Sequence, residues 1–294
     1  MGEETVIVTG CSSGIGLETA LFLAERGFRV TATMRDLARG EILRSEAERR
    51  RVQMETLRLD ITDAQSIRRA VDTVLERSGE IFGLVNNAGI NIRGFFEDLS
   101  QEEMRRVFEV NVFGTMAVSR SVLPSMRSKG RGRIVLISSV GGRQPALGIS
   151  AYCASKFSLE GFGQTLAQEV SPFGIRVSVV EPGLVHTELF GRNRILAGRA
   201  LDPAGPYREW FLNLEAFTDR MVNSPATTPR DVAQAVFRAL RAKRPKLHYL
   251  VGRRTRVLVA LRRFLPEELF DRVWMREAQR RIQRTAGQSH RARR

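Results

Sequence analysis

The sequence predicts an α/β fold built on a parallel β-sheet. Short apolar runs rich in Val, Ile, Leu and Thr alternate along the chain with longer, charged stretches of helical character. Consecutive apolar runs are far enough apart to hold a crossover helix, which parallel strands require. There is no internal repeat and no low-complexity linker, so we expect one domain with an extension. The expected strands lie near residues 5–9, 28–34, 56–59, 82–86, 133–138, 176–181 and 247–251.

The first expected strand leads into a glycine-rich turn over residues 5–16 (TVIVTGCSSGIG), and a helix-like stretch follows over residues 17–26. Gly10 permits a tight turn, while Gly14 and Gly16 would let a phosphate approach backbone N–H groups at the helix N-terminus. The spacing Gly-x3-Gly-x-Gly differs from the commonest dinucleotide fingerprint, Gly-x-Gly-x-x-Gly. The turn therefore predicts a phosphate or dinucleotide site, with an ordinary glycine-rich loop as the alternative.

A second pattern lies more than a hundred residues downstream, where Tyr152 and Lys156 are four residues apart. Positions i and i+4 share one face of a helix, so the phenol and the ammonium would point to the same place. A nearby cation is expected to lower the pKa of a phenol from its ordinary value of about 10. Tyr152 is therefore a candidate acid/base, and the alternative is a solvated helix face.

These two patterns and four others resemble the classical short-chain dehydrogenase/reductase family, over about residues 4–250. The six occur in the family's order: the glycine turn, Asp60-Ile61, Asn86-Asn87-Ala88-Gly89, Asn111, Ser139 with Tyr152 and Lys156, and Pro182-Gly183 followed by Thr187. The resemblance implies a Rossmann-type, doubly wound sheet of seven parallel strands in the order 3-2-1-4-5-6-7, with helices on both faces.

The resemblance also implies an oxidoreductase that interconverts an alcohol and its carbonyl partner by hydride transfer. Tyr152 would act as general acid or base, and Lys156 would lower its pKa and bind the nicotinamide ribose. Ser139, thirteen residues before Tyr152, would hold the substrate oxygen, and Asn111 would hold a water linked to Lys156. Cofactor contacts are expected from Gly10, Ser12, Ser13, Gly14, Ile15, Gly16, Arg35, Asp60, Ile61, Asn87, Ala88, Gly89, Tyr152, Lys156, Pro182, Gly183, Val185 and Thr187.

The end of the second expected strand favours NADP(H) over NAD(H). NAD enzymes place a carboxylate there for the ribose 2′-hydroxyl, whereas NADP enzymes place a cation there for the 2′-phosphate. The family's selecting carboxylate corresponds to Met34, and Arg35 follows it directly. A guanidinium pairs well with phosphate. Asp36 is the alternative selecting residue and would favour NAD(H), although it lies two residues after the position of the family's carboxylate.

The substrate is expected to be a hydrophobic small molecule. Several segments, including residues 152–157 (YCASKF), resemble the estrogenic hydroxysteroid dehydrogenases and photoreceptor retinol dehydrogenases. Residues 184–225 should form a lid with apolar members Leu189, Phe190, Trp210, Phe211, Phe217 and Met221, and the alternative is that these side chains only pack the lid helices. One alternative function is a reductase of lipid or polyketide keto groups, including carrier-bound ones, and another is a non-catalytic cofactor-sensing protein.

Most of the net charge of +15 lies in the last part of the chain. Residues 241–294 contain seventeen Lys or Arg and four Asp or Glu, a net +13, while residues 1–240 carry a net +2. We therefore expect a dehydrogenase domain over residues 1–252 and a basic, amphipathic helical extension over residues 253–294. The extension would dock on an anionic membrane surface or an acidic carrier protein, or else pack on the body. Nucleic-acid binding is not expected, because no aromatic-plus-basic module is present.

The remaining features predict a cytoplasmic enzyme, with peripheral membrane attachment as an option through the basic extension. No signal peptide and no long apolar run are visible. The two cysteines form no metal-binding pattern, so no metal is expected. The family resemblance implies a homodimer or homotetramer that pairs helices over about residues 100–127 and 151–170.

Overall fold

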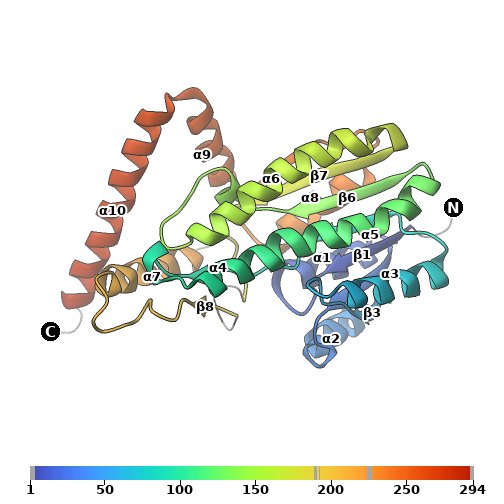
Figure 1. Cartoon of the computed structure of the whole chain (residues 1–294), viewed down its shortest axis with the longest axis horizontal. Helices are drawn as coiled ribbons and strands as arrows, with labels where there is room; N and C mark the ends of the chain where they lie inside the picture. The colour runs from blue at the N-terminus through green and yellow to red at the C-terminus, as the bar shows by residue number, and fades with distance from the viewer. Residues whose placement is uncertain (1–3, 189–190, 192, 224–226, 292–294) are drawn as a thin grey trace.

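The computed structural model describes residues 4–188, 191, 193–223 and 227–291. Its centre is a seven-stranded parallel sheet with the order β3-β2-β1-β4-β6-β7-β9, which confirms the predicted topology (Figure 1). Every strand lies within about a residue of its predicted range. The strands are β1 Thr5–Thr9, β2 Arg29–Met34, β3 Glu55–Arg58, β4 Gly83–Asn86, β6 Gly132–Ile137, β7 Ile175–Pro182 and β9 His248–Val251.

Helices cover both faces of this sheet. Successive side chains of a strand point to opposite faces, so an apolar strand presents apolar side chains on both faces, and both must be covered. In β1, Val6 and Val8 join one buried cluster, while Ile7 between them joins the other. The first cluster is covered by α1 Gly14–Glu25, α2 Glu41–Arg50 and α8 Pro229–Arg241. The second is covered by α3 Ala64–Ser78, α5 Thr115–Ser128 and α6 Ser150–Val170.

A third apolar cluster lies beyond the carboxyl edge of the sheet and belongs to the lid. It joins α4 Gln101–Phe108 to α7 Arg208–Val222 and to a two-stranded parallel pair, β5 Ile92–Arg93 with β8 Ile195–Leu196. The sequence did not predict this pair, because two-residue strands carry no readable periodicity.

The chain ends in a V of two helices, α9 Arg253–Phe264 and α10 Glu267–Arg291, and α10 packs against the lid helix α7 (Figure 1). Ile282 of α10 is buried in the lid cluster. Among the described residues, no helix combines the length and the apolar character that crossing a bilayer demands.

Candidate active site

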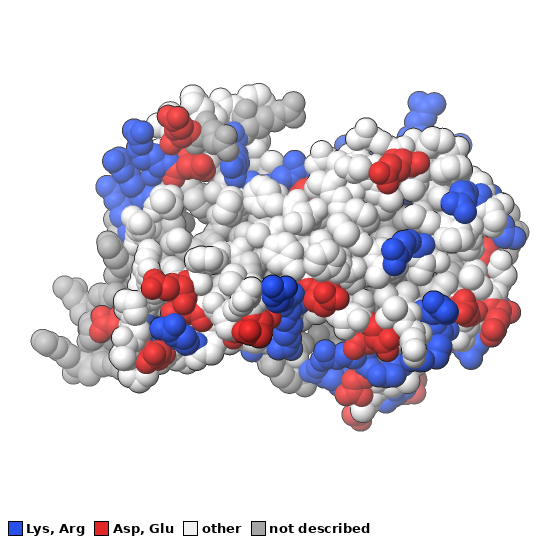
Figure 2. Space-filling view, in the orientation of Figure 1, with Lys and Arg blue, Asp and Glu red and all other residues white. Residues whose placement is uncertain are grey.

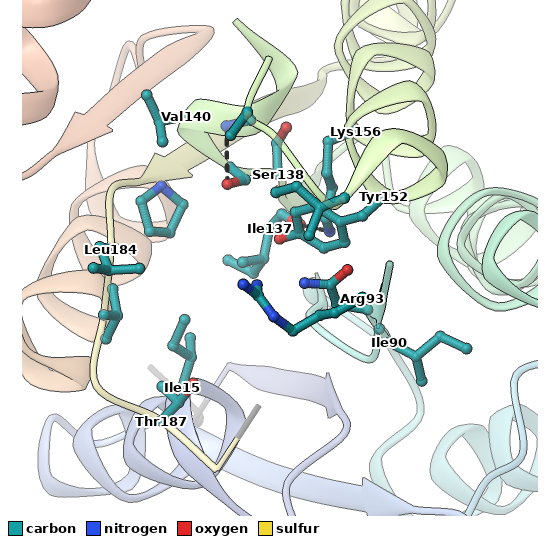
Figure 3. Close-up of a pocket in the computed structure, with 18 of the residues that line it drawn as sticks. Ile15, Ile90, Arg93, Ile137, Ser138, Val140, Tyr152, Lys156, Leu184 and Thr187 are labelled. Atoms are coloured by element: carbon teal, nitrogen blue, oxygen red, sulfur yellow. Dashed lines mark hydrogen bonds between the residues drawn. The ribbon is translucent and has the colours of Figure 1, made fainter. Parts of the chain in front are cut away.

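One large cavity of about 2610 Å³ lies at the carboxyl edge of the sheet, where ligands bind in open parallel sheets. The predicted site residues that line it lie at the ends of six strands, β1, β2, β3, β4, β6 and β7, or near the start of α6. All of the predicted catalytic and cofactor residues line this cavity except Gly16 and Asn111. Figure 3 shows Tyr152 and Lys156 on one wall and Ile15 with Thr187 on the opposite wall. The volume exceeds that of a pocket for one small ligand and suits a dinucleotide with a substrate.

The glycine turn leaves space for a phosphate group. Gly10 and Gly14 have φ values of +74° and +59°, which favour glycine over other residues. Helix α1 begins at Gly14, and its first turn carries no acidic side chain that would repel an anion. The residues therefore fit the diphosphate of a dinucleotide.

Gly16 has a packing role in the turn that was not predicted. A Cβ atom on Gly16 would lie 2.3 Å from the carbonyl oxygen of Gly10 and 2.4 Å from Nδ2 of Asn87. Asn87 in turn donates from Nδ2 to the main-chain oxygens of Thr9 (2.9 Å) and Gly10 (3.2 Å). Gly16 is buried and lets α1 pack against the loop after β4, and its expected contact with a phosphate remains a prediction.

Helix α6 places Tyr152 and Lys156 on the same wall, as their spacing predicts. Ser139 lies beside the phenol and acts to lower its pKa, and its Oγ accepts the main-chain N–H of Gly141 at 3.0 Å. Lys156 is buried and donates from Nζ to the carbonyl oxygen of Ile137 at 2.8 Å. Burial lowers the pKa of Lys156 to about 8, and the nearby carboxylate of Glu160 partly opposes this effect.

The expected lowering of the Tyr152 pKa is absent from this structure. Tyr152 is partly accessible from the cavity, yet the surrounding protein desolvates the phenol and raises its pKa to about 12, with Ser139 acting in the opposite direction. Nζ of Lys156 lies 5.5 Å from the centre of the tyrosine ring and is directed to Ile137. Burial therefore dominates the pKa of Tyr152, and the phenol holds its proton near neutral pH.

Asn111 lies in a π-helical turn, Glu109–Gly114, between α4 and α5. Its Oδ1 accepts the N–H of Ile90 at 2.8 Å, and its Nδ2 donates to the carbonyl of Ile90 at 2.9 Å and to Ser155 Oγ at 3.0 Å. This side chain is buried and ties the loop after β4 to α6. Its expected water-holding role remains a prediction.

At the far end of the cavity, the ends of β2 and β3 present arginines beside Asp60. Arg35 lines the cavity, and Arg58 donates from Nε to the carbonyl oxygen of Arg35 at 3.3 Å. The pKa of Asp60 is lowered because hydrogen bonds from Thr62 and the charges of the two arginines outweigh burial, which alone would raise it. Asp36, the rival for cofactor choice, accepts the N–H of Ala38 at 3.0 Å and caps the short helix Leu37–Gly40.

The predicted lid residues divide into two groups. Phe217 and Met221 line the cavity. Phe211 is fully buried, and Trp210 stacks on Phe95 with ring centres 4.6 Å apart, so these two pack the lid itself, as the alternative interpretation held. Leu189 and Phe190 lie outside the described residues.

Two features of the cavity wall were not predicted. Arg93 of β5 projects into the space between the two walls (Figure 3) and forms a buried ion pair with Glu215 of α7, at 2.5 Å. Trp274 and Met275 of α10 also line the cavity. Both features depend on where the lid and the extension pack against the body. The apolar stripe of α10 indicated that this helix has a packing partner, but it did not indicate the cavity.

Near the catalytic wall lies a partly buried ionic cluster, with two buried glutamates, that no sequence motif indicated. Arg143 contacts Glu181 at 2.8 Å and Glu160 at 3.3 Å, and His248 Nδ1 lies 2.7 Å from Glu181. The two carboxylates and the imidazole are close enough together to hold a metal ion. The guanidinium of Arg143 already supplies the positive charge among them. Burial, followed by the charge of Glu181, raises the pKa of Glu160 to about 7.

Comparisons with known proteins agree with this geometry. A family model described as short chain dehydrogenase matches residues 4–195. Human 17-beta-hydroxysteroid dehydrogenase type 1 is 36% identical over 271 residues, covering 89% of this chain and 81% of that protein. Bovine retinol dehydrogenase 8 is 35% identical over 273 residues, covering 90% of this chain and 86% of that protein.

Two solved structures add information on cofactors. A short chain dehydrogenase/reductase from Burkholderia phymatum in complex with NAD has a TM-score of 0.78 and 26% identity, covering 89% of this chain and 93% of that one. A single-residue variant of actinorhodin polyketide ketoreductase with NADPH has a TM-score of 0.73 and 30% identity. This match covers 86% of this chain and 98% of the ketoreductase chain. The chain therefore belongs to the short-chain dehydrogenase/reductase family of oxidoreductases.

Proposed function

We propose that this oxidoreductase interconverts a hydrophobic alcohol and its ketone or aldehyde, with NADP(H) as cofactor. The observation that carries the proposal is the placement of Tyr152 beside Ser139 on one wall of a cavity whose lid end is largely apolar. The names of the hydroxysteroid and retinol dehydrogenase relatives favour a steroid-, retinoid- or lipid-like substrate.

The residues of this chain would provide binding and proton transfer. A bound nicotinamide would supply or accept the hydride. Ser139 would hold the substrate oxygen, and Tyr152 would donate its proton to that oxygen in the reductive direction. A phenol that holds its proton is the form that this step requires. Lys156, whose pKa of about 8 keeps it largely charged near neutral pH, would offset the negative charge left on the phenol.

The preference for NADP(H) rests on the end of β2. Met34, at the position of the family's selecting carboxylate, is buried, and the Asp36 carboxylate caps a short helix. Arg35 and Arg58 are exposed beside each other at this edge. Two guanidinium groups favour a 2′-phosphate over a 2′-hydroxyl.

A carrier-bound or polyketide keto group is the second candidate substrate, favoured by the likeness to a polyketide ketoreductase and by the basic extension. A panel that contains free steroid ketones and retinoid aldehydes beside a carrier-bound keto ester would distinguish the two, because a carrier-dependent enzyme would turn over the bound ester far faster. Assembly as a homodimer or homotetramer also remains a prediction.

The proposal is tested by following NADPH oxidation with such a panel in the full-length protein and in two variants. Tyr152→Phe should lower turnover by about a hundredfold or more, the range that positioned acid/base groups commonly contribute. Tyr249→Phe is the matched control, since its hydroxyl accepts the N–H of Lys246 at 3.2 Å on the edge strand β9, outside the cavity. Equal rates in the wild type and both variants would refute the mechanism.

A further inference from the structure

The corner between α9 and α10 carries the most exposed large apolar side chain among the described residues. Phe264 at the end of α9 is 82% exposed. Further exposed apolar residues lie on the same two helices: Val257, Leu261, Leu265, Leu269 and Val273. Val257, Leu261 and Phe264 follow helical spacing and form one stripe along α9. Contiguous exposed apolar residues of this kind mark an interaction surface.

The corner stands away from the body, while both arms of the V are attached to it (Figure 1). On the α9 side, Arg262 donates to Gln144 Oε1 at 3.0 Å and to the carbonyl oxygen of Arg143. On the α10 side, Ile282 is buried in the lid cluster. The projecting apolar surface is therefore held in place by the fold.

The charge around the corner identifies the kind of partner. Helix α9 contains five arginines and no acidic residue. On α10, the exposed Arg272, Arg276 and Arg280 follow the apolar Leu269 and Val273 along the helix, and Figure 2 shows basic residues gathered over this helix. An apolar tip flanked by arginines fits the boundary between acyl chains and anionic headgroups. An acidic protein would be recognised by the arginines alone and would leave the apolar tip unexplained.

The substrate cavity extends to this same surface. Its lining includes Val257, Leu258 and Leu261 of α9, and Trp274 and Met275 of α10. Val257 and Leu261 therefore belong both to the exposed stripe and to the cavity wall. Apolar side chains therefore continue from the exposed stripe into the cavity wall.

We propose that the α9–α10 corner inserts into an anionic lipid surface and that the hydrophobic substrate enters the cavity from the lipid, between these two helices. The route of entry rests on the proposed function, whereas the lipid binding does not. Each arginine near an anionic surface strengthens binding about fivefold. Loss of one large buried apolar side chain weakens it about ten- to a hundredfold.

The test uses the full-length protein and sedimentation with vesicles of phosphatidylcholine, either alone or mixed with phosphatidylglycerol. The protein should bind the mixed vesicles, and added salt should weaken this binding. Phe264→Glu should reduce the binding at least tenfold. Phe96→Glu is the matched control, because Phe96 is 67% exposed on the body and lies outside the cavity. A full-length protein that ignores the mixed vesicles, or two variants that bind them equally well, would overturn the proposal.

Turnover separates the two halves of the proposal. Phe264→Glu should leave the rate with a water-soluble ketone unchanged and lower the rate with an apolar ketone dissolved in vesicles. If no ketone is turned over but the vesicles are bound, the proposed function fails and the lipid surface stands. If Phe264→Glu instead splits a dimer in solution, or releases an acidic acyl carrier protein, the corner binds protein and the lipid proposal is refuted.

Discussion

Glu160→Gln should make the protein more stable at alkaline pH and flatten the dependence of its stability on pH. Glu160 is 5% exposed and lies in the cluster of Arg143, Glu181 and His248 near the catalytic wall. Burial, followed by the charge of Glu181, raises its pKa from 4.5 to about 7. Glutamine has nearly the same shape and does not ionise.

The direction of the change in stability with pH follows from the direction of this pKa change. Because the pKa is higher in the folded than in the unfolded state, the contribution of Glu160 to stability is complete below about pH 4.5. It is lost as the pH rises through about 7, where the buried carboxyl must ionise. The difference corresponds to at most about 3 kcal/mol in the free energy of unfolding. Arg143 keeps Glu181 as a partner at 2.8 Å in the variant, so its charge stays paired.

The assay is urea unfolding followed by far-ultraviolet circular dichroism between pH 5 and pH 8. The variant should exceed the wild type only slightly at pH 5, by about 1 kcal/mol or less, and by up to about 3 kcal/mol at pH 8. Glu169→Gln is the matched control, because Glu169 is exposed on the same helix. A variant that is less stable than the wild type at pH 8, or a control with the same gain, would refute the reasoning.

Two further changes test the cofactor end of the cavity. Arg35→Ala should raise the dissociation constant of NADPH about ten- to a hundredfold and that of NADH little, measured by fluorescence titration, because it removes a charge-assisted hydrogen bond. Arg29→Ala is the control, because Arg29 is exposed at the other end of β2. Equal losses of affinity for NADPH and NADH in Arg35→Ala would exclude Arg35 as the residue that selects the cofactor. Gly16→Ala should cost about 1–3 kcal/mol of stability through its 2.3 Å approach to Gly10. Gly161→Ala is the control, because a Cβ atom on this exposed glycine of α6 would have no neighbour within 4 Å. This substitution should leave the free energy of unfolding unchanged or raise it in the same urea experiment.

The main sheet was predictable because its signal is local. Each strand is a short apolar run such as β1, whose Val6, Ile7 and Val8 are buried on both faces, and each is followed by enough residues for a crossover helix. Parallel connections then bring the carboxyl ends of the strands to one edge. For this reason Gly10, Arg35 and Asp60, which are distant in the sequence, line the same cavity.

Other parts of the site were not readable, because they depend on distances that no local spacing determines. The spacing of Tyr152 and Lys156 placed both on one wall, yet it did not show that Nζ would turn to Ile137 or that burial would raise the pKa of the phenol. Likewise, Glu160, Glu181 and Arg143 come from three separate elements and meet only in the folded chain.

The sequence by itself determined the family, the order of the strands and the residues at the strand ends, because periodicity and short motifs carry that information. The tertiary structure decided what each residue packs against: Gly16 lies against Gly10 and Asn87, and Trp210 packs the lid while Phe217 lines the cavity. It also decided that the basic extension is part of the cavity, since helix α10 folds back on α7 through long-range packing of Ile282. Charge and composition show that such a helix is amphipathic, but its partner surface is chosen only when the whole chain is folded.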